Sequence, residues 1–420
     1  MKRTIRVDAL GRVEGEGCFR VNIDDQGVGK VEFGIYEPPR FFEAFLRGRF
    51  FSEAPDLTSR ICGICPVAHQ LTSTLAMENA LGLEVGGGWR DLRRLIYCGE
   101  WIESHALHIF MLHAPDFLDY PDALAMARDH PKVVETGLKI KKLGNRIMSL
   151  VGGREIHPIN LKVGGFYGLP KQAEMDDLSP ELAWAVDACQ EALDWLGSLP
   201  FPDYERDYLL VTLRAGDEYP IDQGQRIVSS NGLDIPVAQF EDHFQEQQLA
   251  YSTALHATLK GQGQYLLGPM ARFNLNFGFL TGLAQETARK IGLEPSCRNP
   301  FKSILMRGVE LLYACEEAQR LVQAYQPPDK AALEIKPGPG QGSACTEAPR
   351  GLLHHSYVLD ESANIQKANI VTPTSQNQGA IEQDLHDVVA QNMELGEKEL
   401  TKLCETTVRN YDPCISCSTH

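Results

Sequence analysis

The sequence predicts an α+β fold, predominantly helical, with long core helices and small peripheral β-sheets in a single domain of residues 1–420. Three observations favour this fold. The first forty residues alternate apolar and polar side chains, helical periodicity follows from Phe41 onward, and two Cys-x-x-Cys motifs stand near opposite ends of the chain. Because the two motifs together suggest one site, the ends of the chain are expected to meet in the core.

Two strand pairs are predicted, one near each end of the chain. Phe19–Ile23 and Val31–Ile35 lie on either side of the turn formers Asp24–Gly27, and their alternating pattern is typical of a β-hairpin. Near the C-terminus, Tyr357–Leu359 and Ile365–Val371 flank a second polar turn, which predicts another pair.

Helices are expected between these pairs. Asp91–His113 predicts one long helix closed by Pro115, with four side chains on one face at spacings of three and four residues: Trp101, His105, His108 and Leu112. Ser179 is expected to cap another helix. Residues 327–342 are rich in proline and glycine and predict an irregular connection, and a final helix leads into the second cysteine motif.

The chain is acidic, with a formal net charge of −16 and a pI near 5.2. This charge argues against nucleic acid and anionic membranes as partners, because both require a basic face. No apolar run approaches the roughly 20 residues that span a bilayer. The opening MKRTIRVDALGR lacks the apolar stretch of a signal peptide. A cytoplasmic protein without a membrane span is therefore expected, and export would need a partner's signal.

The 11 cysteines are too few and too scattered for a disulfide framework in a chain this long. Seven show no ligand spacing and are expected to be small buried apolar residues: Cys18, Cys98, Cys189, Cys297, Cys315, Cys345 and Cys404. The other four form the motifs Cys62-Gly63-Ile64-Cys65 and Cys414-Ile415-Ser416-Cys417. Four thiolates favour zinc, an iron–sulfur cluster, or nickel and iron, so the surroundings must decide among these metals.

Several further motifs follow one another along the chain. They are RVEGEG around Glu14, PRFFEAFLRGR with Glu43, RICGICPVAH, GGREIHP at residues 152–158, EAPRG with Arg350, TPTS with Thr374, and DPCISCSTH. On this set the chain resembles the large, catalytic subunit of nickel–iron hydrogenases over nearly its full length. Its RVEGEG, PRFFEA and DPCISCS segments look most like the cytoplasmic, NAD(P)-linked, sulfhydrogenase-type alpha subunits.

In that family four cysteines hold nickel, and two of them bridge to an iron that carries carbon monoxide and cyanide. The resemblance implies that Cys62 and Cys414 are terminal nickel ligands, whereas Cys65 and Cys417 bridge. Thiolates suit this role because they are soft donors that let nickel change oxidation state and can accept a proton. His69, one helical turn past Cys65, is expected to donate a hydrogen bond to that bridging sulfur.

Heterolytic splitting of dihydrogen requires a Lewis acid for the hydride and a base for the proton. The resemblance implies that Arg350 projects over the open metal position, where it orients dihydrogen or takes its proton, and that Asp412 pairs with it. Glu14 matches the glutamate that takes a proton from a terminal cysteine, here Cys414, and passes it outward. Glu16 is expected to be a solvated or structural residue.

The resemblance also implies two sets of ligand contacts. Thr374, neighbouring Ser375 and the backbone at Pro349 and Arg350 would hold the cyanides, because anionic ligands in a dry pocket need fixed donors. A magnesium or iron ion close to the active site would be bound by carboxylate, carbonyl and imidazole groups from Glu43, Ile370 and His420.

Other polar residues are expected to have supporting roles. Ser104 stands where many respiratory members carry an aspartate, so an acidic partner of Arg350 is missing on that side. His105 and His157 are expected to be hydrogen-bonding residues near the site or in the core, because the family leaves no metal for them. Residues 152–158 are expected to shape the cavity or a partner interface.

With the four motif cysteines on nickel, the sequence offers no cluster ligands and no nucleotide-binding glycine motif. Electrons are expected to leave through an iron–sulfur small subunit, and then through flavin- and NAD(P)-binding and further iron–sulfur subunits. A deazaflavin or a heterodisulfide reductase is an alternative acceptor, and reduction of polysulfide stays open. A maturation protease and nickel-insertion proteins are further expected partners, because the sequence resembles the mature form.

Two other classes of function stay open. A metal-free relative, like the quinone-site subunit of respiratory complex I, would share the fold but typically lack the four cysteines. A zinc-stapled structural protein would keep the cysteines and leave Arg350 and the other motifs unexplained. Metal analysis would separate the zinc protein from a hydrogenase.

Overall fold

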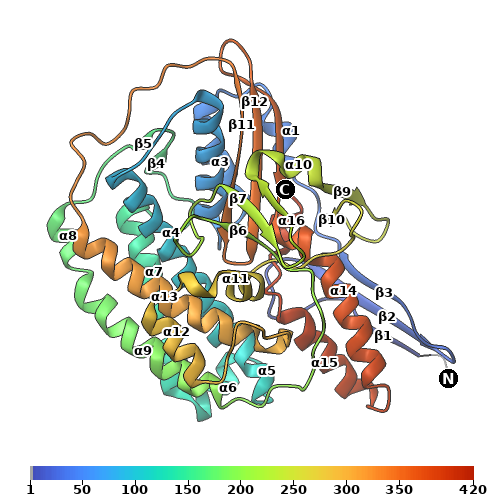
Figure 1. Ribbon diagram of the computed structural model, residues 1–420. Helices are drawn as coiled ribbons and strands as arrows, with labels where there is room; N and C mark the ends of the chain where they lie inside the picture. The colour runs from blue at the N-terminus through green and yellow to red at the C-terminus, as the bar shows by residue number, and fades with distance from the viewer. Residues whose placement is uncertain (1–2) are drawn as a thin grey trace.

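Long helices form the centre of the computed structural model, which describes residues 3–420 (Figure 1). Four of them pack side by side, namely α4, α7, α9 and α13, and α3 stands beside them against a sheet. In chain order the α-helices are α1 (Phe42–Leu46), α2 (Ala54–Thr58), α3 (Pro66–Leu81), α4 (Gly88–Ala106), α5 (Ala114–Phe117), α6 (Ala123–Asp129), α7 (Pro131–Gly152), α8 (Gln172–Asp176), α9 (Ser179–Gly197), α10 (Phe240–His243), α11 (Pro269–Asn276), α12 (Gly282–Lys290), α13 (Ser303–Ala324), α14 (Pro373–Gln391), α15 (Glu397–Arg409) and α16 (Ile415–Ser418). The short 3-10 turns are η1 (Phe51–Glu53), η2 (Ser59–Ile61), η4 (Val237–Gln239), η5 (Phe277–Phe279) and η6 (Pro300–Lys302), and η3 (Leu107–His113) is π-helical.

The described residues form five small antiparallel sheets around this centre. Their strands are β1 (Arg3–Val7), β2 (Gly17–Asp24) and β3 (Gly27–Ile35); β4 (Leu161–Lys162) and β5 (Gly165–Phe166); β6 (Val211–Arg214), β7 (Arg226–Ser229) and β8 (Asp234–Pro236); β9 (Phe244–Gln248) and β10 (Leu255–Leu259); and β11 (Gly340–Ala348), β12 (Gly351–Leu359) and β13 (Ile365–Val371). The predicted α+β fold, mostly helical with small sheets, is confirmed.

Both predicted strand pairs are present. In the N-terminal hairpin Phe19 stands opposite Phe33, and the pair gains a third strand, β1. The C-terminal pair also gains a third strand, β11, which begins inside the stretch predicted to be irregular. Gly342 explains this, because a Cβ there would lie 2.3 Å from the carbonyl oxygen of Ala76 on α3. Glycine thus allows the strand to lie directly against the helix.

The long helix predicted over residues 91–113 is wrong in its last third. The α-helix ends at Ala106, and residues 107–113 form the π-helical turn η3. Pro115 cannot donate a backbone hydrogen bond to this turn and clashes with an α-helical carbonyl before it. The wider turn brings the rings of His108 and His113 into tilted contact, with centroids 4.9 Å apart, and Leu112 is only half-buried.

The predicted cap at Ser179 is also wrong. Its side chain makes no capping hydrogen bond, because helical residues 177 and 178 already lead from α8 into α9.

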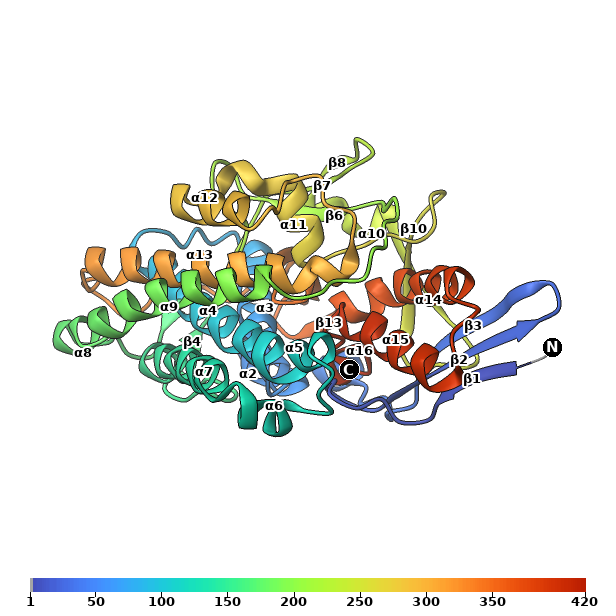
Figure 2. The same cartoon turned by 90° about the horizontal axis from the view of Figure 1, so that it is seen from below.

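The two ends of the chain meet in the core, as predicted. The backbone N–H of Ile415 donates to the carbonyl of Glu14 at 3.0 Å, and that of Arg40 donates to Thr419 at 2.8 Å. Figure 2 shows α14, α15 and α16 beside the N-terminal sheet. The last residues are therefore held between the first forty residues and the central helices.

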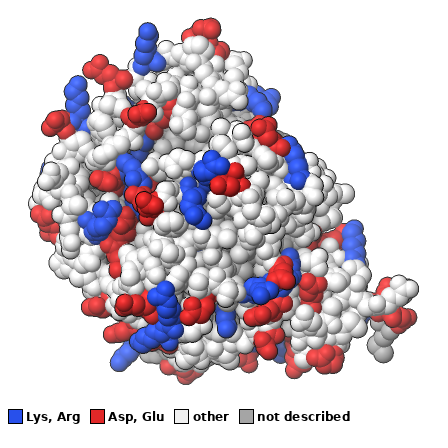
Figure 3. Space-filling view, viewed as in Figure 1, with Lys and Arg blue, Asp and Glu red and all other residues white. Residues whose placement is uncertain are grey.

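Acidic and basic side chains are interspersed on the face drawn in Figure 3. Within residues 3–420, every helix falls short of the length and apolarity that a membrane span requires.

Candidate metal centre

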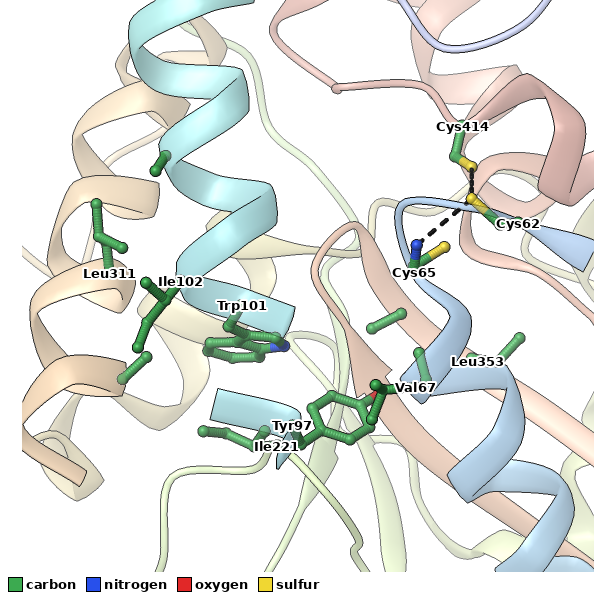
Figure 4. Packing of buried hydrophobic residues seen from close by; sticks show 14 of the residues in the cluster. Cys62, Cys65, Val67, Tyr97, Trp101, Ile102, Ile221, Leu311, Leu353 and Cys414 are labelled. Atoms are coloured by element: carbon green, nitrogen blue, oxygen red, sulfur yellow. Dashed lines mark hydrogen bonds between the residues drawn. The ribbon is translucent and has the colours of Figure 1, made fainter. Parts of the chain in front are cut away.

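The four motif cysteines form one buried cluster. Their sulfur atoms all lie within 4.8 Å of one another, with Cys62 Sγ 3.4 Å from Cys414 Sγ and Cys65 Sγ 3.3 Å from Cys417 Sγ. Figure 4 shows Cys62 and Cys65 at the start of α3, with Cys414 facing them from the end of the chain. The arrangement brings together two pairs that are 352 positions apart.

Local backbone structure holds the first pair in place. Cys65 directly precedes α3, and Pro66 occupies the first turn, where a missing N–H does no harm. The backbone N–H groups of Ile64 and Cys65 donate to Cys62 Sγ at 3.3 and 3.4 Å. These donors and the helix N-terminus both stabilise negative charge on sulfur.

The four thiols do not ionise with equal ease. Hydrogen bonds from the neighbouring thiols hold the pKa of Cys62 well below its usual range, whereas burial raises the pKa of Cys414 and of Cys417. One thiolate therefore forms readily, and further ionisation is opposed. A soft cation fits this donor set, because its charge would allow the remaining thiols to ionise.

Arg350 and Asp412 are paired, as predicted. Arg350 Nε donates to the backbone carbonyl of Asp412 at 2.7 Å, and Nη2 donates to its carboxylate at 3.2 Å. Burial opposes the charge on Arg350, but Asp412 and Cys414 outweigh it and raise the pKa of the guanidinium well above its usual range. Nη1 has no hydrogen-bond partner within residues 3–420.

Glu14 lies against the second cysteine motif. It pairs with Cys414 as a short parallel bridge, and its carboxylate accepts hydrogen bonds from the backbone N–H and the hydroxyl of Ser416. Burial, and then the charge of Cys62, raises the pKa of Glu14. Ser416 Oγ also lies 3.2 Å from a carboxylate oxygen of half-buried Glu37.

Glu16 is exposed, which agrees with its predicted solvated role.

The three groups predicted to bind a hard cation converge. Glu43 accepts the backbone N–H of Ile370 at 2.7 Å, while His420 Nε2 lies 2.8 Å from the Ile370 carbonyl oxygen. His420 Nδ1 lies 2.7 Å from the carbonyl of Cys417. A neutral imidazole has only one N–H, so one ring nitrogen faces a carbonyl oxygen with a lone pair. A cation between the ring nitrogen and the carbonyl oxygen would remove the repulsion of their lone pairs. The three residues therefore fit a cation site.

Of the residues predicted to hold the iron's ligands, Thr374 contacts a motif cysteine directly. Thr374 Oγ1 accepts the backbone N–H of Cys414 at 3.0 Å and keeps its own proton to donate. The Ser375 hydroxyl already donates to the Thr372 carbonyl at 2.8 Å, and the Pro349 carbonyl accepts a hydrogen bond from Arg272.

Within residues 3–420, the remaining histidines do not gather into a metal site. His69 is buried, and its Nδ1 lies 3.4 Å from His355 Nε2; burial lowers its pKa to about 3. His105 Nε2 is buried 3.0 Å from a carboxylate oxygen of Glu310, and His157 Nδ1 lies 2.7 Å from the Ser59 carbonyl oxygen. The predicted hydrogen-bonding role is confirmed for His157.

Five of the seven remaining cysteines are buried as predicted. Cys18 and Cys297 are partly exposed, so that prediction is wrong for these two. Cys297 packs against the edge of the main hydrophobic core, where a small side chain does not need complete burial.

Three residues near the site carried no signal in the sequence: Glu37, His355 and Glu246. Burial, and then the charge of Glu43, raises the pKa of Glu246 to about 8, and one of its carboxylate oxygens has no partner within residues 3–420. None belongs to a spacing pattern, because tertiary contacts alone bring each one to the site.

A buried site of four thiols, a fixed guanidinium and a carboxylate beside a thiol defines a metalloenzyme that handles protons. The model of the nickel-dependent hydrogenase family matches residues 40–136 and 303–420. The chain is 34% identical to sulfhydrogenase 1 subunit alpha of Pyrococcus furiosus, over 99% of this chain and 97% of that protein. It is 30% identical to NAD-reducing hydrogenase HoxS subunit beta of Cupriavidus necator, over 100% and 95%. The chain belongs to the nickel-dependent hydrogenase family.

The fold agrees with this assignment. The structure of an NAD+-reducing [NiFe]-hydrogenase in the H2-reduced state matches with a TM-score of 0.91 and 26% identity, covering 100% of this chain and 99% of that one. The predicted family and the predicted nickel–iron hydrogenase activity are confirmed. A metal-free subunit and a zinc-stapled structural protein both fail to account for the family match.

Proposed function

We propose that this chain is the catalytic subunit of a cytoplasmic hydrogenase that passes electrons from dihydrogen to an iron–sulfur small subunit and on to NAD(P). The observation that carries the proposal is the single buried cluster that the two cysteine pairs form. Relatives named as a sulfhydrogenase alpha subunit and as NAD-reducing hydrogenases support the acceptor and the multi-subunit assembly. Flavin-binding and further iron–sulfur subunits, a maturation protease and nickel-insertion proteins complete the proposed partners.

The four cysteines would hold the nickel–iron centre, with Cys62 and Cys414 on nickel alone and Cys65 and Cys417 shared with iron. Bound there, the centre supplies the Lewis acidity and the change of oxidation state that splitting dihydrogen requires. The iron's carbon monoxide and cyanide ligands would be held in the dry pocket by the Thr374 hydroxyl and by the backbone at Pro349 and Arg350, with Ser375 as the neighbouring donor.

Arg350 acts in this site as a fixed donor. Asp412 keeps the guanidinium charged and oriented through two hydrogen bonds, so the side chain is poised to orient the substrate and is a poor proton acceptor. A donor held in place before the reaction needs no reorganisation when charge develops.

Glu14 is the proposed proton acceptor beside Cys414. Its raised pKa brings the carboxyl closer to neutral pH, where it can both take and release a proton. Ser416 and half-buried Glu37 then offer a hydrogen-bonded continuation toward the surface. His69 would orient or tune the bridging sulfur of Cys65, and His355 fixes its ring.

Glu43, Ile370 and His420 would bind magnesium or iron, and the facing acceptors at Ile370 and His420 support this site. The proposed ion ties the last residue of the sequence to β13 and α1, which keeps the second cysteine pair in place.

The acceptor is tested with the purified native complex under dihydrogen, offered NAD+, NADP+, a deazaflavin, a heterodisulfide or polysulfide. Reduction of NAD+ or NADP+ is expected. Reduction of only the deazaflavin or the heterodisulfide would overturn the proposed acceptor and leave the hydrogenase assignment intact. A nickel-loaded complex that fails to reduce even a viologen dye would overturn the function itself.

A further inference from the structure

Glu103 is a buried carboxylate that the account above does not use. It lies in the last turn of α4 and is 6% exposed. Its Oε1 is 2.7 Å from Lys141 Nζ on α7, whereas Oε2 has no hydrogen-bond partner within residues 3–420. A buried carboxylate oxygen without a donor is costly, and such an atom calls for an explanation.

The helix that carries Glu103 contacts the metal centre one turn earlier. One turn earlier on α4, Glu100 accepts hydrogen bonds from the backbone N–H groups of Val67 and Ala68 at 2.6 and 3.1 Å. These two residues lie in the first turn of α3, directly after Cys65. Because residues three apart share a face of a helix, Glu103 lies one turn further along the same side of α4.

The charges around Glu103 agree with this position. Burial raises its pKa, Lys141 and Arg350 lower it, and Cys62 raises it. The charges of the Arg350 guanidinium and of Cys62, a proposed nickel ligand, therefore both act on the Glu103 carboxyl group. Next to it, the buried Ser104 hydroxyl has no partner within the described chain.

The outer side of Glu103 leads to solvent through Lys141, whose side chain is 25% exposed. The helices α4 and α7 approach closely here, since a Cβ on Gly144 would lie 2.6 Å from the backbone nitrogen of Glu103. Gly144 stands one turn after Lys141, and this close packing sets the lysine over the carboxylate.

We propose that Glu103 and Lys141 form a second proton outlet, which connects the Arg350 side of the metal pocket with solvent in parallel with Glu14. The inference rests on the proposed function. Glu103 Oε2 takes a proton from the pocket and becomes neutral. Lys141 has then lost its carboxylate partner and releases one ammonium proton to water. Finally, the neutral amine takes the proton from Glu103, which restores both charges and moves one proton outward.

The competing explanation is that the Glu103–Lys141 ion pair only joins α4 to α7. The variant Lys141→Arg distinguishes this explanation from a proton outlet. Arginine keeps the ion pair but does not release its proton, so it preserves a structural role and blocks a relay. Glu103→Gln keeps the shape of the side chain and removes the proton-accepting oxygen. The control is Glu181→Gln on α9, which breaks a partly exposed ion pair with Arg146 of α7, the helix that carries Lys141.

The native complex carrying each variant is assayed for exchange between D2 and water, which needs proton movement but no electron acceptor. We expect Glu103→Gln and Lys141→Arg each to slow exchange by about tenfold, less than the full effect of a proton-transfer group because Glu14 remains. Combining either change with Glu14→Gln should abolish the residual exchange. The infrared difference spectrum between argon and dihydrogen should contain a carboxyl band that Glu103→Gln removes and Glu181→Gln retains.

Exchange at the parent rate in Lys141→Arg, with the Glu14→Gln, Glu103→Gln double variant no slower than Glu14→Gln alone, would overturn the outlet and leave a structural ion pair. If Glu103→Gln fails to assemble, Lys141→Arg decides, since its melting temperature should match that of the unaltered complex. An unaltered, nickel-loaded complex without any exchange would contradict the proposed function rather than the outlet.

Discussion

Arg350 is fixed by Asp412 through both its backbone and its side chain. The guanidinium Nε donates to the Asp412 carbonyl at 2.7 Å and Nη2 donates to the carboxylate at 3.2 Å. Asp412 adopts a left-handed backbone conformation, with φ of 51°, two residues before Cys414. The segment that delivers the second cysteine pair therefore also positions the arginine, so the site is complete only when the C-terminal segment is in place.

Replacing Arg350 by lysine should lower dihydrogen oxidation by roughly 100- to 1000-fold, because the fixed fork of donors is lost where charge develops. Nickel and iron content should stay unchanged, since the four cysteines are intact. Arg128→Lys on the exposed face of α6 is the control. Activity of Arg350→Lys within twofold of the parent would contradict the role of the guanidinium.

Replacing Glu14 by glutamine should slow D2–water exchange by about 100-fold or more, because the carboxyl beside Cys414 no longer accepts a proton. Glu16→Gln is the matched control, two residues away and exposed. Equal exchange rates in the two variants would remove Glu14 from the proton route.

Glu310 should make stability depend on pH. Burial opposes its charge, but Arg272 at 2.6 Å outweighs this and lowers the pKa of Glu310 from 4.5 to about 2. A carboxyl group whose pKa is lowered by folding stabilises the folded state at pH values above its pKa in the unfolded chain. This contribution is lost as the pH falls from about 4.5 toward 2. Glu310→Gln should therefore lower the free energy of unfolding by roughly 3 to 5 kcal/mol at neutral pH.

The difference between Glu310→Gln and the parent should narrow steadily below pH 4.5 in denaturant titrations. A difference that stays constant down to pH 3 would show that the glutamine acts through packing instead of charge.

Removing the proposed hard cation should destabilise the second cysteine pair. His420→Ala and Glu43→Gln are each expected to lose one magnesium or iron per chain and to lower the melting temperature, because His420 holds the Cys417 and Ile370 carbonyls together. Glu361→Gln in the exposed turn before β13 is the control. Full metal content in both variants, measured by mass spectrometry of metals, would exclude this site.

The sequence predicted the parts of the site that belong to compact motifs. Cys62 and Cys414 stand in short segments whose spacing already indicates a shared metal, and Asp412 lies close enough to Cys414 to share its segment. The Glu103–Lys141 contact and the His69–His355 contact were not predictable, because each joins helices or strands whose packing no local pattern records.

The elements of the fold, like the site residues, were predictable only where a local sequence pattern records them. The N-terminal hairpin follows from alternation, since one of its faces is buried. Strand β11 was missed because nearly all of its second half is buried, and its glycines resemble those of a loop. The π-helical turn at residues 107–113 was missed because a count of 3.6 residues per turn cannot register an inserted residue.

The most direct test of the account is an infrared spectrum of the purified complex in the region of metal-bound carbon monoxide and cyanide, with nickel and iron quantified on the same sample. The account predicts carbon monoxide and cyanide bands together with nickel and iron in equal amounts, and loss of all of them in Cys417→Ser. A fully matured complex that contains zinc or no metal, and shows none of these bands, would contradict it.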